Sequence, residues 1–153
     1  MSTAGLLVLV ATLCAATAVG LVLRARSGRV RAASPVAPSG SSAPPAPSGW
    51  DLAGVAPDGT GQVLLLQLSS PVCAPCRQTA TVLGGLAADD PSLRHVEIDV
   101  AERTDVARAL GVLRTPTTVA FDTGGAELAR VSGVPRVDEL LAAVHRPAEA
   151  DRQ

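Results

Sequence analysis

A short apolar run near the middle of the chain constrains the fold more than any other feature. Residues Val63 to Leu68 are apolar except for Gln67, and the turn signal Asp58-Gly59 stands before them. A strand that is hydrophobic on both faces needs a covering layer on each side of its sheet. The run therefore predicts the central strand of a sheet that lies between helices.

Helix and strand patterns alternate after this run. We predict helices over 74–88, 102–110 and 137–145, and strands over 93–100, 117–121 and 127–131. A strand, a helix and a strand in succession form a parallel crossover, whereas a hairpin adds antiparallel strands. The predicted fold class is therefore α/β, with a mixed central sheet in three layers, α/β/α.

An uncharged stretch of twenty residues, Ala4 to Leu23, precedes the predicted domain. About 20 apolar residues cross a bilayer as a helix, so we expect one transmembrane helix over 4–23. A cleaved signal peptide is the alternative, because Ala16-Thr17-Ala18 resembles a cleavage site. The stretch has no basic residue before it and exceeds the ~7 to 15 residues of a signal-peptide core, which favours the anchor. Cys14 is expected to be a small buried apolar residue there.

Four basic residues follow the apolar stretch: Arg24, Arg26, Arg29 and Arg31. Basic residues near a membrane helix tend to stay in the cytoplasm, so we expect a cytoplasmic domain, with the extracytoplasmic side as the alternative. Residues 32–49 include five prolines, a composition typical of an extended spacer. We therefore expect a basic juxtamembrane segment and linker over 24–49, a folded domain over 50–147 and a disordered tail over 148–153.

The charge distribution argues against a nucleic-acid partner. The formal net charge of the chain is −1, and Trp50 and Phe121 are its only aromatic residues. A nucleic-acid surface needs clustered basic side chains and usually stacking aromatics. We expect no nucleic-acid binding.

A Cys-x-x-Cys pair stands where the predicted central strand gives way to a helix. The free N–H groups and the dipole at a helix N-terminus favour a thiolate, so Cys73 is the predicted nucleophile. Cys76, one turn further on, is the predicted resolving thiol, which attacks a mixed disulfide formed at Cys73. Pro75 between them suits the first turn of a helix.

Two other interpretations of the pair are less favoured. A zinc site usually needs four ligands, and beyond the pair the domain offers only His95 and His145, so no metal and no cofactor is expected. Two inert buried cysteines would not normally flank Ala-Pro at a junction between a strand and a helix.

A second motif, Thr115-Pro116-Thr117, stands directly before a predicted strand, with Pro116 forty positions after Cys76. Together with the strand, the Cys-x-x-Cys pair and the helix, it makes residues 62–145 resemble a thioredoxin. The resemblance implies that Pro116 has a cis peptide bond and lies beside the cysteine pair. It also implies that Thr115 presents its backbone to an extended substrate strand.

The chain departs from that family pattern in four places. No Trp precedes Cys73, and the stretch from Trp50 to Gln62 has room for one small element instead of a strand and a helix. Gln67 stands where the family carries a buried acid that assists deprotonation of the resolving cysteine. His95 stands near the position of a buried Lys, and either water or His95 is expected to replace the acid, although His95 is more often a polar residue at a strand end.

The resemblance implies a thiol–disulfide oxidoreductase that acts on disulfide-bearing proteins, and we expect the apolar stretch over 4–23 to tether it to a membrane. A cytosolic domain would act mainly as a reductase, with electrons from an NADPH-dependent thioredoxin reductase. An external domain would need a membrane thiol carrier as its donor. The alternative function is a binding or redox-sensing module that uses the surface around Thr115 without general turnover; the missing acid favours it slightly, and the presence of both cysteines favours the enzyme.

Overall fold

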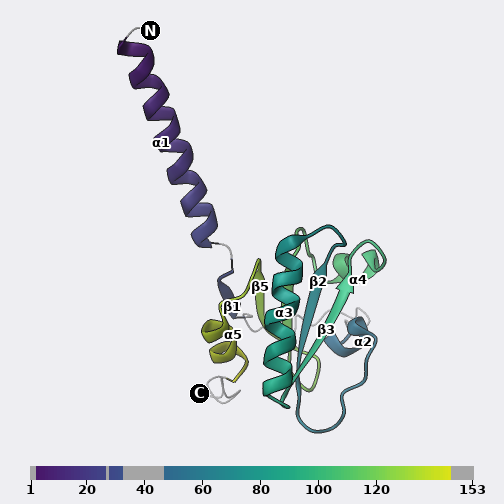
Figure 1. Cartoon of the computed structure of the whole chain (residues 1–153). Helices are drawn as coiled ribbons and strands as arrows, with labels where there is room; N and C mark the ends of the chain where they lie inside the picture. Colours follow the sequence, from purple (N-terminus) through teal and green to yellow (C-terminus); the bar gives the residue numbers. More distant parts are fainter. Residues whose placement is uncertain (1–2, 27, 33–46, 146–153) are drawn as a thin grey trace, which may run out of the picture.

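A mixed sheet of five strands organises the folded part of the chain. The computed structural model describes residues 3–26, 28–32 and 47–145 (Figure 1). Its strands are β1 (Val30–Ala32), β2 (Val63–Ser69), β3 (Leu93–Asp99), β4 (Thr117–Phe121) and β5 (Glu127–Ser132). Its helices are α1 (Thr3–Arg26), α2 (Gly49–Ala53), α3 (Ala74–Asp89), α4 (Thr104–Ala109) and α5 (Val137–Val144).

The strands lie in the order β1-β5-β4-β2-β3. Strands β2 and β3 are parallel and connected through α3, whereas the other neighbouring pairs are antiparallel. From residue 63 onward the predicted elements are confirmed, and each boundary lies within two residues of the predicted one. The α/β fold class with a mixed sheet is therefore confirmed.

Helices cover both faces of this sheet. On one face, Leu83 of α3 and Leu140 of α5 belong to the same buried cluster as Leu65 of β2. On the other face, Trp50 of α2 and Val106 of α4 share a buried cluster with alternate leucines of β2. Successive side chains of a strand point to opposite faces, so β2 contributes to both halves of the core. This explains why its sequence is apolar almost without interruption.

Helix α2 is the one small element that the stretch before β2 has room for. Its Trp50 is buried, and the indole Nε1–H donates a hydrogen bond of 2.8 Å to the Asp122 carbonyl oxygen in the β4–β5 turn. Gly49 lies so close to the Phe121 ring that a Cβ atom there would stand 2.2 Å from it. These contacts fix α2 to the end of the β4–β5 hairpin.

Strand β1 lies inside the segment that was predicted to be a linker. Its residues pair antiparallel with β5, with Val30 opposite Val131 and Ala32 opposite Ala129. The prediction missed it because three residues beside arginines carry no periodic apolar signal, and only pairing with a distant strand makes them a strand. Residues 28–32 are thus part of the sheet, whereas 33–46 of the predicted linker and the predicted tail at 148–153 lie outside the described residues.

Helix α1 is long and apolar enough to cross a bilayer. Its segment Thr3–Val22 has a mean hydropathy of 2.4, and none of it is buried against the other described residues. A signal sequence near an N-terminus has the same length and composition. Cys14, which was expected to be buried, is exposed on this helix as a free thiol.

Candidate active site

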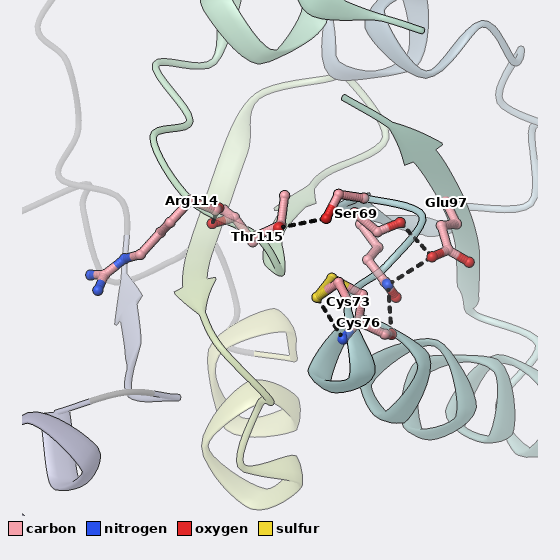
Figure 2. Close-up of a disulfide and its surroundings, with 9 residues drawn as sticks. Ser69, Cys73, Cys76, Glu97, Arg114 and Thr115 are labelled. Atoms are coloured by element: carbon pink, nitrogen blue, oxygen red, sulfur yellow. Dashed lines mark hydrogen bonds between the residues drawn. A yellow bond between two sulfur atoms is a disulfide. The ribbon is translucent and has the colours of Figure 1, made fainter. Parts of the chain in front are cut away.

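The cysteine pair lies at the junction of β2 and α3. Cys73 and Cys76 are joined by a disulfide bond, and Cys73 is the N-cap residue of α3 (Figure 2). The Cys76 backbone N–H donates a hydrogen bond of 3.1 Å to the Cys73 Sγ atom. The end of the helix therefore presents a donor to the first sulfur, as expected for a site that stabilises negative charge there.

The two sulfurs differ in how far they can be reached from solvent. Cys73 is half-buried, whereas the exposed fraction of Cys76 is 2%. An incoming disulfide or thiol meets Cys73 first because Cys76 is covered. The predicted roles of nucleophile for Cys73 and resolving thiol for Cys76 remain predictions.

Thr115 and Pro116 lie across from the pair, at the start of β4. The Thr115–Pro116 peptide bond is cis, as the resemblance implies, and Pro116 is buried. The Thr115 hydroxyl is 3.2 Å from the hydroxyl of Ser70, which follows β2. The segment that leads from β2 to the cysteine pair is thus close to Thr115 through the side chain of Ser70.

Gln67 lies beneath the disulfide and is fully buried. Its Nε2 donates to the Cys76 carbonyl oxygen at 3.0 Å and to Glu97 Oε1 at 3.1 Å. Its Oε1 lies 3.1 Å from Nε2 of His95. The amide thus has partners on both of its polar atoms, and it links the backbone of α3 to two side chains of β3.

Glu97 is the site residue that the sequence analysis missed. It stands opposite Gln67 in the parallel register of β2 and β3, and its Oε1 also accepts a hydrogen bond from the Ser69 hydroxyl. Glu97 is exposed, and its position in the strand alone does not predict which groups its carboxylate contacts. The signal available in the sequence was a polar residue in each of two predicted parallel strands, Gln67 and Glu97, which lie opposite each other in the observed register.

Glu97 and Cys76 line the same surface pocket. The pocket has a volume of about 390 Å³, and its lining includes Ser69, Cys76, Glu97 and Asp99. Water in such a pocket would contact both the covered sulfur and the carboxylate.

His95 is engaged with Gln67, and among the described residues it has no hydrogen bond to either cysteine. Because Gln67 Oε1 can only accept, the network assigns the proton of the neutral ring to Nε2. Burial lowers the pKa of His95, and the nearby Glu97 carboxylate opposes this shift. His95 is thus favoured as a neutral donor that holds Gln67 in place.

Two exposed apolar side chains stand close to the site in the chain. Val72 and Leu113 are 95% and 97% exposed, and they stand beside Cys73 and near Thr115 in the chain. A groove of about 630 Å³ continues from Leu113 and Thr115 toward α4. Within residues 3–26, 28–32 and 47–145, no group of three or more His, Cys, Asp or Glu could hold a metal ion.

Comparison with known proteins agrees with this geometry. The family model described as Thioredoxin matches residues 58–146. Thioredoxin H-type from Fagopyrum esculentum is similar to this chain at 32% identity over 93 residues, which covers 60% of this chain and 78% of that protein. NADPH-dependent thioredoxin reductase 3 from Arabidopsis thaliana is 34% identical over 74 residues, which are 48% of this chain but only 14% of that protein.

A solved structure shows the same fold. A mutant thioredoxin from Halobacterium salinarum NRC-1 is 30% identical in sequence and superposes with a TM-score of 0.50, covering 54% of this chain and 72% of that one. The matched family model spans more than half of the chain and includes both the cysteine pair and the cis-proline. The chain therefore belongs to the thioredoxin family.

Proposed function

We propose that this thioredoxin-family chain is a thiol–disulfide oxidoreductase that uses Cys73 as nucleophile and Cys76 as resolving thiol. The observation that supports this most is the difference in exposure between the two bonded cysteines at the start of α3. One sulfur is open to a partner, and the other is covered and one helical turn away.

The proposed reaction conserves atoms and electrons. The Cys73 thiolate attacks a substrate disulfide, forms a mixed disulfide and displaces the first substrate thiolate. The Cys76 thiolate then attacks Cys73 Sγ, closes the Cys73–Cys76 disulfide and displaces the second substrate thiolate. The substrate gains two electrons and its sulfurs take up two protons, while the protein dithiol is oxidised.

The second step requires the buried Cys76 thiol to lose its proton, and Glu97 is our proposed acceptor. It lines the same pocket as Cys76, and hydrogen bonds from Ser69 and Gln67 hold its Oε1. One water molecule between the two side chains would complete the path. In this proposal a carboxylate from β3 and an amide from β2 together take over the role of the acid that position 67 lacks.

Thr115 is the proposed substrate-binding residue, together with Pro116. Among the described residues, no hydrogen bond uses the backbone N–H or C=O of Thr115, whereas the Pro116 carbonyl accepts from the Gly133 N–H at 2.8 Å. Free backbone groups beside a reactive sulfur can pair with an extended segment of a substrate. The exposed Val72 and Leu113 would then contact its apolar side chains.

Insulin reduction in the presence of dithiothreitol tests the activity. We expect Cys73→Ser and Cys76→Ser each to abolish the protein-dependent rate, because each removes one sulfur of the exchange. Cys14→Ser is the matched control, because it removes a free thiol that lies on α1 and outside the site. An unchanged insulin rate in Cys73→Ser would contradict the proposed roles.

A binding or redox-sensing module is the second candidate, favoured by Gln67 in place of an acid. The Cys76→Ser protein separates the two. An oxidoreductase accumulates mixed disulfides through Cys73 with several proteins, whereas a module holds one partner and retains it when Cys73 is also replaced.

For location, we propose that residues 4–23 anchor the protein in a membrane, with the arginines that follow on the cytoplasmic side. The support is the length and hydropathy of α1. Reduction is then the expected direction, and an NADPH-dependent thioredoxin reductase the expected donor. Protease digestion of intact protoplasts tests the topology: a protected domain agrees with the proposal, and a digested one indicates the external side and a membrane thiol carrier.

The mass of the isolated protein tests the anchor itself. A membrane-spanning α1 is retained in the mature chain and is extracted only with detergent. A chain that has lost its first residues and dissolves in buffer would contradict the anchor and agree with a signal peptide.

A further inference from the structure

Two connecting segments join the parts of this chain, and they differ greatly in length. One residue separates Arg26, the last residue of α1, from Gly28, which is bonded to the sheet. The segment 33–46, which contains four prolines, comes after β1 and before α2. It therefore connects two elements of the domain and does not separate the domain from α1.

Strand β1 is held from three sides. The Gly28 N–H donates a hydrogen bond of 2.7 Å to the Ser132 carbonyl oxygen. Val30 packs on the buried cluster beneath α5, and its N–H donates to Glu139 Oε2 at 3.2 Å. Gly28 also has a φ of +79°, and a Cβ there would lie 2.4 Å from the Val134 carbonyl oxygen. Glycine is thus required where the chain enters the sheet.

The chain enters at the reactive end of the sheet. Ser132, which binds Gly28, is opposite Thr117 in the β4–β5 register, and Thr117 directly follows Pro116. Adjacent strands lie about 4.8 Å apart, so two strand spacings put Gly28 roughly 10 Å from the start of β4. Figure 1 shows β1 following α1 at the edge of the sheet.

We infer that β1 holds the reactive end of the domain close to the bilayer surface. The substrates of the domain are then disulfides of membrane-bound proteins at that surface. This inference rests on the proposed oxidoreductase function and on the proposed anchor. A fourteen-residue Pro-rich tether would let the domain move about 40 Å away, at ~3.1 Å per residue. One connecting residue adds only about 3.5 Å.

Charge at the junction fits a membrane surface. Arg29 and Arg31 are both exposed, and they line a surface pocket together with Val30 and Glu139 of α5. Basic side chains beside a membrane helix are attracted to anionic lipid headgroups. The two arginines would therefore favour contact between β1 and the bilayer.

The test uses the full chain in vesicles of phosphatidylcholine and phosphatidylglycerol, with dithiothreitol as donor. The probe is a fluorogenic disulfide peptide, supplied either free or linked to a lipid. One variant carries an insertion of roughly twelve Gly and Ser residues after position 27. The matched control carries the same insertion after Gly40, within the segment between β1 and α2.

We expect the wild-type chain to reduce the lipid-linked peptide preferentially, because both reactants share the surface. The insertion after position 27 should lower the ratio of lipid-linked to free rates about tenfold, because effective concentration falls with tether length. The control insertion should leave the ratio unchanged. An unchanged ratio in the first variant, or an equal fall in both, overturns the inference while the proposed function stands.

A substitution gives an independent measurement. Gly28→Val should release β1 and lower the ratio as the insertion does, because the side chain meets the Val134 carbonyl oxygen. Gly59→Val is its control, since Gly59 has the same φ of +79° and no atom within 4 Å of an added Cβ. A wild-type chain that reduces neither peptide contradicts the proposed function, and a chain that does not float with the vesicles contradicts the anchor.

Discussion

The two flanks of the disulfide differ in character. Figure 2 shows Thr115 on one side of the cysteine pair and Glu97 on the other. The Thr115 flank is exposed and carries the apolar side chain of Leu113 and the charged side chain of Arg114 beside free backbone groups. The Glu97 flank is a hydrogen-bonded network around a buried amide. Under the proposed function, one flank would serve substrate contact at Cys73 and the other would serve proton transfer at Cys76.

The largest effect should come from removing the buried amide of the polar flank. Gln67→Leu removes the hydrogen bonds of the buried amide to the Cys76 carbonyl oxygen, to Glu97 and to His95, whose part-buried Nε2–H loses its partner. Unsatisfied buried groups cost about 1–3 kcal/mol each, so we expect the free energy of unfolding to fall by about 3 kcal/mol. Urea denaturation measures it. Gln62→Leu, which loses an exposed hydrogen bond to Pro91, is the control, and equal losses would contradict a special role of Gln67.

The next effect separates the two flanks kinetically. Glu97→Gln should slow closure of the Cys73–Cys76 disulfide about tenfold near neutral pH, while attack by Cys73 keeps its rate, because only Cys76 faces this carboxylate. Stopped-flow measurement gives the rates of both steps as a function of pH. In the mutant, the rate of disulfide closure should rise more steeply with hydroxide concentration than in the wild type.

Glu102→Gln provides the control for that experiment, because Glu102 lines the same pocket without a hydrogen bond to Gln67. If both variants have the wild-type pH profile, Glu97 does not accept the proton.

A smaller effect is expected on the Thr115 flank. Leu113→Asp puts a charge on an exposed rim without disturbing the core, so we expect KM for insulin to rise about threefold with kcat unchanged. The rate with a small disulfide such as dithiobis-nitrobenzoate should stay constant. A fall in kcat with both substrates would instead assign Leu113 to the chemical step.

The smallest effect is the pH dependence of the unfolding free energy, which should arise from His95 on the Glu97 flank. Burial lowers the pKa of His95 in the folded state, so the unfolded chain binds a proton more readily. The corresponding stability is present above the ordinary histidine pKa of about 6.5 and is lost as pH falls through the lower folded value. His95→Gln should flatten this part of the curve of unfolding free energy against pH. If the unfolding free energy of the wild type does not change with pH in this range, the expected contribution of His95 is contradicted.

Much of the fold follows from local patterns in the sequence. The apolar run of β2 and the amphipathic pattern of α5 depend on neighbours in the chain, and both elements form where predicted. The cysteine pair and Pro116 meet because the βα junction and the start of β4 lie at one end of the sheet.

The features that could not be predicted depend on contacts between distant residues. Strand β1 forms by pairing with β5, in which Val30 lies opposite Val131, about a hundred positions away in the chain. The role of Glu97 depends on its register with Gln67, since alternation describes which face a residue occupies but not its partner on the next strand. Register and edge pairing are thus the physical information that single-chain patterns lack.

Strand β1 also protects the protein from self-association. An unpaired strand at a sheet edge exposes N–H and C=O groups that pair with other chains, and β1 covers that edge of β5. A soluble version that begins at Trp50 would leave β5 open and should aggregate, whereas one that begins at Gly28 should stay monomeric. The few residues between the apolar helix and the prolines thus determine where a soluble domain can safely begin.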